Sequence, residues 1–107
     1  MAGAKFVVLY PMPKDVAAFE KVYLEEHVPM AVENLKGKSK IVASKPVESV
    51  LGKPAIYRYV EVHYPSMEAL QASLASPGAK KTAEHAVKIS SGGAPTFLIA
   101  EEQVFEF

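Results

Sequence analysis

The chain has 107 residues, half of them apolar and 22% charged, which is typical of one folded domain with a modest core. Its 12 basic residues balance 12 acidic residues, so no strong positive field is present to attract nucleic acid or an anionic membrane surface. Cysteine is absent, which excludes disulfides, thiolate metal sites and cysteine nucleophiles. We expect a single cytoplasmic domain over residues 1–107, with no apolar run long enough to cross a membrane.

The first part of the chain predicts a strand, a turn and one helix. Residues 5–10 are mostly apolar and favour a strand, and a proline-rich turn follows. Asp15 is a suitable N-cap for a helix, and Pro29 is expected to end that helix, with Val28 before it extended. Residues 31–36 are expected to add an irregular turn. The buried face of the helix is predicted to carry Val16, Phe19, Tyr23 and His27.

The middle of the chain predicts two further strands. Residues 39–47 favour a strand, and residues 50–54 favour a hairpin loop because they contain glycine and proline. Residues 55–64 alternate in polarity and predict a strand that Pro65 ends. One face of this strand is expected to lie along a polar cavity or at the solvated end of the sheet. That face would hold Tyr57, Tyr59, Glu61 and His63.

Two capped helices and a strand are expected in the last part of the chain. Ser66 is a suitable cap for a helix that places Met67, Leu70 and Leu74 on one face. Ser76 followed by proline predicts the start of another helix, which reaches about residue 89. Residues 96–107 favour one long or bent strand. The inner face of the second helix is predicted to carry Ala79, Ala83, Ala86 and Val87, whose small size favours close packing.

The predicted order of elements is βαββαβ, with the second helical region divided in two. This order is typical of an α+β, ferredoxin-like antiparallel sheet with helices on one face. The other face of such a sheet is bare in a monomer, so we expect a homodimer. Its apolar residues are expected to include Val60 and Val62, or Phe97 and Ile99.

Several of these segments carry a resemblance to a known family. They are the turn at residues 10–11, the helix with Phe19 and Tyr23, the His27-Val28-Pro29 segment, and strand 56–64 followed by residues 66–70. Together they resemble the EthD family, which is named for ethyl tert-butyl ether degradation. The resemblance implies a ferredoxin-like fold that pairs into a dimeric α+β barrel. It implies little about the reaction, because that wider group of barrels hosts unrelated chemistries.

His27 is the leading candidate for chemistry. An imidazole has an unperturbed pKa near ~6.5, so its environment decides whether it serves as an acid or a base. One interpretation makes His27 a general acid/base, or a hydrogen-bond donor to an oxygen-bearing ligand. The other makes it a polar cap bonded to the carbonyls of the last helical turn. The sequence leaves both interpretations open.

Tyrosines and one further histidine complete the candidate site. We expect Tyr23 to act beside His27, because a phenol can hold a carbonyl oxygen through one hydrogen bond. His85 is predicted to lie on the surface of its helix, where it could rim a pocket. Ordinary core or interface packing is the alternative for the aromatic residues. The predicted ligand-binding residues are Tyr10, Phe19, Tyr57, Tyr59 and His85.

No motif for a metal or cofactor is present. No two of the three histidines lie at i, i+4 on one helix, and no glycine-rich phosphate loop occurs. We therefore expect no metal, haem or other cofactor.

Three functional hypotheses follow from the sequence. The first is a homodimer that binds an apolar, oxygen-bearing small molecule, either as a binding protein or as a cofactor-free enzyme of proton transfer, such as an isomerase, dehydratase or decarboxylase. The second is a cofactor-independent monooxygenase. The third is a non-catalytic ligand carrier or accessory subunit. The residues do not decide whether the protein is an enzyme.

Overall fold

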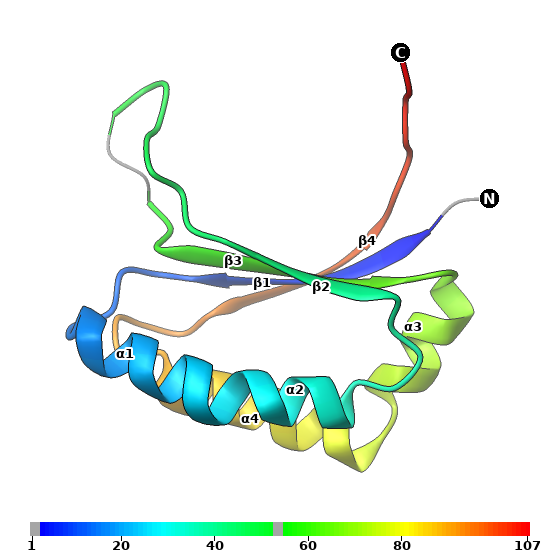
Figure 1. Ribbon diagram of the computed structural model, residues 1–107, viewed down its shortest axis with the longest axis horizontal. Coiled ribbons are helices and arrows are strands. Elements are labelled where there is room, and N and C mark those ends of the chain that lie inside the picture. Colours follow the sequence, from blue (N-terminus) through cyan, green and yellow to red (C-terminus); the bar gives the residue numbers. More distant parts are fainter. Residues whose placement is uncertain (1–2, 53–54) are drawn as a thin grey trace.

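The computed structural model describes residues 3–52 and 55–107 (Figure 1). The strands are β1 (Ala4–Tyr10), β2 (Lys40–Ser44), β3 (Arg58–Tyr64) and β4 (Thr96–Glu101). The helices are α1 (Val16–Val22), the π-helical turn η1 (Tyr23–His27), α2 (Val28–Asn34), α3 (Met67–Leu74) and α4 (Pro77–Ile89). The strands form one antiparallel sheet in the order β2-β3-β1-β4. The predicted ferredoxin-like fold is confirmed.

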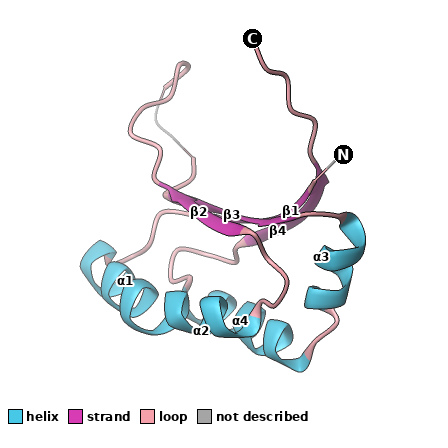
Figure 2. Ribbon diagram, turned by 45° about the vertical axis from the view of Figure 1, so that its right-hand side comes forward, coloured by secondary structure: helices cyan, strands magenta, loops and turns pink. Residues whose placement is uncertain are grey.

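The helices all lie on one side of the sheet (Figures 1 and 2). Residues 45–52 after β2 and the residues after β4 extend from the sheet on the opposite side (Figures 1 and 2). None of the helices in the part of the chain that the structure describes is long and apolar enough to cross a membrane.

The register of the strands corrects the predicted assignment of sheet faces. Val8 pairs with Val60 and with Phe97, so these three side chains share one face. That face meets the helices, because Val8, Val60 and Val62 are all buried. The prediction that Val60, Val62 and Phe97 lie on the bare face is therefore wrong. Ile99 pairs with Phe6 and belongs to the helix side as well.

The bare face carries the other set of alternating side chains. Tyr59 pairs with Leu9, and Leu98 pairs with Val7. Val42 on β2 pairs with Glu61 of β3, and both side chains point to this face. Leu98 is 47% exposed and Val42 is 37% exposed. The bare face is therefore partly apolar, but the apolar residues on it are not the ones that were predicted.

The helix that begins after Asp15 does not end at Pro29. His27 and Val28 both keep right-handed helical dihedrals, and the Val28 N–H bonds the Tyr23 carbonyl across a π-helical turn. A new series of α-helical hydrogen bonds begins after this turn, so Pro29 lies in the first turn of α2. A proline is tolerated there because its missing N–H would have no partner within the helix. The predicted extended Val28 and irregular turn over residues 31–36 are wrong, since α2 occupies that region.

The three predicted helix starts are confirmed by their caps. The side chains of Asp15, Ser66 and Ser76 accept hydrogen bonds from the backbone N–H three residues later, at 3.0–3.1 Å. Two predicted inward residues are instead exposed. Val16 is 42% exposed because it is the first residue of α1, and Val87 is 50% exposed. Val87 lies beside the true buried stripe of α4, which consists of Ala79, Thr82, Ala86 and Ile89.

Strands β2, β3 and β4 are shorter than predicted. β4 ends at Glu101, and residues 102–107 form no strand. The predicted strand over residues 55–64 begins only at Arg58. In the predicted hairpin loop, an isolated bridge joins Ser49 to Gly52, whereas residues 53–54 lie outside the described part of the chain.

Candidate functional site

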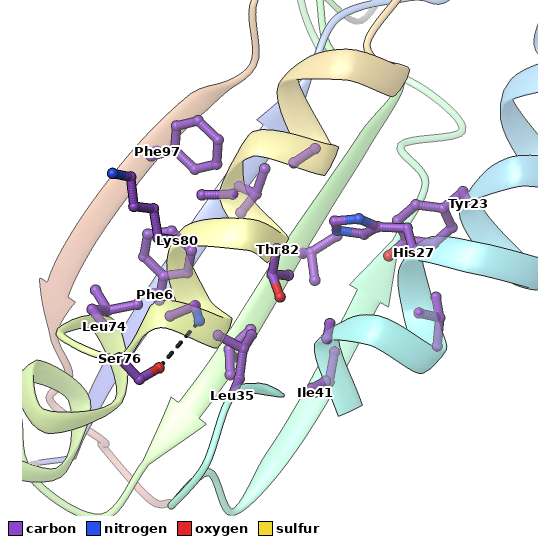
Figure 3. Close-up of a pocket in the computed structure, with 18 of the residues that line it drawn as sticks. Phe6, Tyr23, His27, Leu35, Ile41, Leu74, Ser76, Lys80, Thr82 and Phe97 are labelled. Carbon is purple, nitrogen blue, oxygen red and sulfur yellow. Dashed lines mark hydrogen bonds between the residues drawn. The ribbon is translucent and has the colours of Figure 1, made fainter. Parts of the chain in front are cut away.

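A cavity of about 560 Å³ lies between the sheet and the helix layer (Figure 3). Its walls are mainly apolar and come from all four strands and from η1, α2, α3 and α4. Apolar residues on the sheet side include Phe6, Val8, Val60, Val62 and Phe97. Those on the helix side include Val28, Ala31, Leu35, Ala79, Ala83 and Ala86. The small alanines of α4 leave space that larger side chains would fill.

Six polar side chains also line the cavity. Tyr10, Tyr23 and His27 form a group at one part of the wall, and the other three come from α4 and its cap. Thr82 donates to the Gly78 carbonyl at 2.8 Å, and the Ser76 hydroxyl donates to the Ser73 carbonyl at 2.8 Å. The members from α4 and its cap are Ser76, Lys80 and Thr82.

Tyr10 and His27 meet at the cavity wall. The Tyr10 hydroxyl lies 3.4 Å from Nε2 of His27, and the two side chains are 1% and 7% exposed. Tyr10 is the last residue of β1 on the helix side, while η1 directs His27 toward it. His27 is inside a continuous helical segment and makes no capping hydrogen bond. The interpretation of His27 as a C-terminal helix cap is therefore wrong.

A column of stacked rings supports His27. Phe19 stacks on Tyr23 with centroids 5.6 Å apart, and Tyr23 stacks on His27 at 5.7 Å. His27 stacks in turn on His85 of α4 at 5.1 Å, with an interplanar angle of 12°. The predicted helical stripe explains the first three rings, and packing of α4 against η1 supplies the fourth. The column fixes the plane of the His27 ring.

His27 also bonds to His85 through its second nitrogen. The two Nδ1 atoms are 2.9 Å apart, so one ring donates and the other accepts. Nε2 of His85 lies 4.0 Å from a carboxylate oxygen of Glu26, which is exposed. Burial, with the nearby His85 as a second cause, lowers the pKa of His27 to about 4. At neutral pH His27 is therefore an uncharged imidazole.

Tyr23 also contacts a cation. The guanidinium of Arg58 lies over the Tyr23 ring, 4.4 Å from its centroid, and pairs with Glu20 at 2.6 Å. Burial raises the pKa of Tyr23, and raises the pKa of Tyr10 further, so both are neutral phenols. Both phenols can therefore donate a hydrogen bond.

The structure brings together only some of the predicted site residues. Tyr10, Tyr23 and His27 line the cavity, whereas Phe19 packs against Tyr10 and Tyr23 and lies nearly perpendicular to the ring of Tyr57. Tyr57 does not reach the cavity wall, because its hydroxyl donates to Glu20 at 2.7 Å.

Two further predicted ligand-binding residues lie elsewhere. Tyr59 is on the bare face of the sheet, opposite the cavity. His85 is not on the open surface as predicted; its side chain is 14% exposed and it lies behind His27 rather than on the cavity wall.

Sequence reasoning missed four residues that shape the site. Thr82 could have been found, because it continues the spacing of Ala79 and Ala86 on α4. Glu20 and Arg58 could not have been paired from the sequence, since they are 38 positions apart. Lys80 lies next to the buried Ala79 and reads as an ordinary surface lysine. Within the described residues, no group of three or more His, Asp or Glu side chains could hold a metal ion.

Comparison with known proteins supports the resemblance to the EthD family. An EthD family protein from Bacillus halodurans superposes with a TM-score of 0.84 and 28% identity, over 94% of this chain and 99% of the other. This chain is similar to EthD family proteins. The EthD-like chain is also 28% identical, over 94% of its length, to a Rhodococcus erythropolis protein described as an uncharacterized 11.0 kDa protein in the thcB–thcC intergenic region, of which the match covers 96%. No family model matches the sequence.

More distant structures share the fold of the EthD-like chain. A dimeric ferredoxin-like protein of unknown function from Jannaschia has a TM-score of 0.65 at 12% identity, covering 97% of this chain and 100% of that one. SnoaB, a cofactor-independent oxygenase from Streptomyces nogalater, has a TM-score of 0.63 at 13% identity, covering 100% and 97%. At such identities the likeness concerns the fold alone.

Proposed function

We propose that the protein binds an apolar, oxygen-bearing small molecule in the cavity and catalyses a proton transfer on it without a cofactor. The observation that carries this proposal is the meeting of the Tyr10 hydroxyl and the His27 imidazole on the wall of a mainly apolar cavity. A cavity of about 560 Å³ falls within the usual range of ligand pockets. Isomerisation, dehydration or decarboxylation of an aromatic or polyketide-like compound fits this chemistry.

His27 has the role of the acid/base. Because its pKa is lowered to about 4, the ring is neutral at neutral pH and offers one nitrogen lone pair. The imidazolium that forms on proton uptake is costly in an apolar wall. It forms together with a negative charge on the substrate oxygen, and the attraction between the two charges offsets that cost.

Tyr10 holds the substrate oxygen, with Tyr23 beside it. As a neutral phenol, Tyr10 donates one hydrogen bond, which strengthens when negative charge develops on a carbonyl oxygen. Its contact with His27, at 3.4 Å, is long for a hydrogen bond between side chains. A ligand oxygen can therefore replace the His27 nitrogen as the partner of Tyr10.

A non-catalytic ligand carrier is the second candidate, because the same cavity can hold a ligand without turnover. Cofactor-independent oxygenation is supported here only by the shared fold of SnoaB. No side chain of the described cavity wall favours oxygenation over proton transfer.

We also infer that the protein acts as a cytoplasmic homodimer. The bare sheet face is partly apolar, with Val42 and Leu98 exposed. The C-terminal residues that extend on the same side of the sheet include Phe105 and Phe107, which are both highly exposed (Figure 1). A second copy packed on this face would cover them, and the Jannaschia neighbour is described as dimeric.

The binding proposal is tested by mapping ligand contacts with NMR. A panel of hydroxylated aromatics and aryl ketones would be titrated into labelled protein while amide and aromatic signals are followed. We expect at least one compound to shift the signals of Tyr10, His27 and Ala83, which line the cavity. Shifts confined to residues outside the cavity, or none across the panel, would contradict the proposal.

A further inference from the structure

One proton lies in the hydrogen bond between Nδ1 of His27 and Nδ1 of His85. The two Nδ1 atoms are 2.9 Å apart and the rings stack at 12°, so the pair is held in place. A neutral imidazole has one N–H and one lone pair. If one ring carries its proton on Nδ1, the other must carry it on Nε2. The two neutral histidines therefore occupy opposite tautomers.

Glu26 favours one of the two arrangements. Its carboxylate oxygen lies 4.0 Å from Nε2 of His85, and a carboxylate only accepts hydrogen bonds. It therefore stabilises the tautomer of His85 that has a proton on Nε2, which leaves a lone pair on Nδ1. His27 must then donate from its own Nδ1, because the hydrogen bond that one ring nitrogen makes sets which nitrogen carries the proton.

The tautomer of His27 determines whether its Nε2 presents a lone pair or an N–H to the cavity. With the proton on Nδ1, Nε2 of His27 has a lone pair, and the Tyr10 hydroxyl 3.4 Å away donates to it. A histidine in this state is a base toward a ligand. When His85 is protonated on both nitrogens it must donate to His27 Nδ1, and Nε2 of His27 then carries the proton. The state of His85 thus decides whether His27 faces the cavity as a base or as an acid.

We propose that His85 and Glu26 form a proton relay that sets the tautomer of His27 and connects the cavity to solvent. The proposal rests on the proposed function of His27 as the acid/base. It assigns His85 a positioning role, since His85 does not line the cavity. Glu26 lies at the outer end of the path and is 65% exposed, whereas Tyr10 at the inner end is buried.

The proton count of the relay balances. A substrate proton taken by Nε2 of His27 makes an imidazolium, whose Nδ1 proton passes to Nδ1 of His85. His85 then releases its Nε2 proton to Glu26 or to water beside it. One proton has left the cavity, and both rings are neutral again in exchanged tautomers. The reverse sequence returns one proton to the cavity and restores the starting state.

Other charged and titratable groups surround the pair. Tyr10 faces His27 from β1, and Tyr23 stacks on it from within η1. Arg58 of β3 contacts the Tyr23 ring. On α4, Lys81 and Lys88 are the neighbours of His85 by helical spacing. Among the described residues, the polar side-chain contacts of His85 are to His27 and Glu26.

Nitrogen NMR of the histidine rings tests the relay in the ligand-free protein. Spectra of the full chain at high pH should show a proton on Nδ1 of His27 and on Nε2 of His85. As the pH falls and the pair takes up its first proton, Nε2 of His27 should change from unprotonated to protonated. A wild-type spectrum with the same tautomer on both rings would overturn the proposal. So would a His27 Nε2 signal that does not change with that first proton.

Variants separate the parts of the relay. Glu26→Gln should lower the fraction of His85 with a proton on Nε2, while the control Glu25→Gln, which removes a neighbouring exposed carboxylate, should not. His85→Phe keeps a ring in the stack and should abolish the coupled change at His27. Equal tautomer fractions in Glu26→Gln and Glu25→Gln, or a change at His27 that persists in His85→Phe, would overturn the relay.

Failure of the relay is distinguishable from failure of the proposed function. The tautomers are measured without ligand, so they can be read even if no compound binds the cavity. Conversely, ligand shifts at Tyr10 and His27 would persist if the tautomers proved independent of His85.

Discussion

The guanidinium of Arg58 lies 4.4 Å from the centroid of the Tyr23 ring and 2.6 Å from the carboxylate of Glu20. The same oxygen of Glu20 also accepts the Tyr57 hydroxyl, at 2.7 Å. This cluster joins β3 to α1 and η1 beside the ring column that includes Tyr23 and His27. It therefore contributes to the position of Tyr23 on the cavity wall.

Removing the carboxylate should destabilise the protein. Glu20→Ala leaves the guanidinium of Arg58, which is 6% exposed, without its charge partner. Breaking a buried pair costs several kcal/mol, but Glu20 itself is partly exposed, so we expect a loss of about 2–3 kcal/mol. Urea unfolding would measure it, with Glu25→Ala as the matched surface control. A loss below about 0.5 kcal/mol would mean that the pair contributes little.

Stability should depend on pH through His27. In the unfolded chain His27 binds a proton near pH 6.5, whereas in the folded protein its pKa is about 4. The unfolded state therefore binds more protons between these values, so stability is fully present above about pH 6.5 and falls as the pH drops toward 4. The shift corresponds to about 3 kcal/mol.

His27→Phe isolates this contribution. The variant keeps a ring in the stack but cannot titrate at this position, while all other groups are unchanged. Between pH 7 and pH 4, the unfolding free energy of wild type should fall by about 3 kcal/mol more than that of His27→Phe. A difference that stays constant over this range would show that folding does not disfavour the charged form of His27.

Filling the cavity should block ligand binding without unfolding the protein. Ala83 lines the cavity on α4, so Ala83→Phe would place a large apolar side chain in the space. Because the cavity exceeds the volume that a side chain adds, we expect a change in stability of less than about 1.5 kcal/mol. Thermal shifts by panel compounds should disappear in this variant and persist in Ala17→Phe, which alters an exposed site on α1. Ligand shifts unchanged in Ala83→Phe would place the binding site elsewhere.

A charge on the bare sheet face should prevent dimer formation. Leu98→Glu places a carboxylate within the proposed interface, where it would lose water without gaining a partner. Leu24→Glu is the control, because Leu24 is similarly exposed, at 57%, but lies on the helix side. Sedimentation at micromolar concentration should show a dimer for wild type and Leu24→Glu, and a monomer for Leu98→Glu. A monomeric wild type would contradict the homodimer.

Local signals in the sequence predicted most of the fold. Asp15, Ser66 and Ser76 cap helices through contacts three residues away, so their role depends only on nearby chain. The alternation of β3 was equally plain, but alternation does not reveal which face meets the helices. That choice depends on pairing with β1 and β4, and for this reason Val60 and Val62 were placed on the wrong side.

The site was harder to predict because it depends on long-range packing. Phe19, Tyr23 and His27 were grouped correctly from their helical spacing. The role of Pro29 was misjudged, because a π-helical turn can start a new ladder ahead of a proline and no local signal marks that turn. His85 lies 58 positions from His27, and only the packing of α4 against η1 brings the two rings into contact.

Hydrogen exchange on a bound ketone tests the central claim most directly. An aryl ketone that binds the cavity would be incubated with the protein in heavy water, and deuterium uptake at the carbon beside its carbonyl would be followed. If His27 transfers protons, exchange should be faster with wild type than with His27→Gln by about 10²-fold or more, while both still bind the ketone. Equal exchange in the two proteins, with binding retained, would contradict proton transfer by His27 and leave the protein as a ligand carrier.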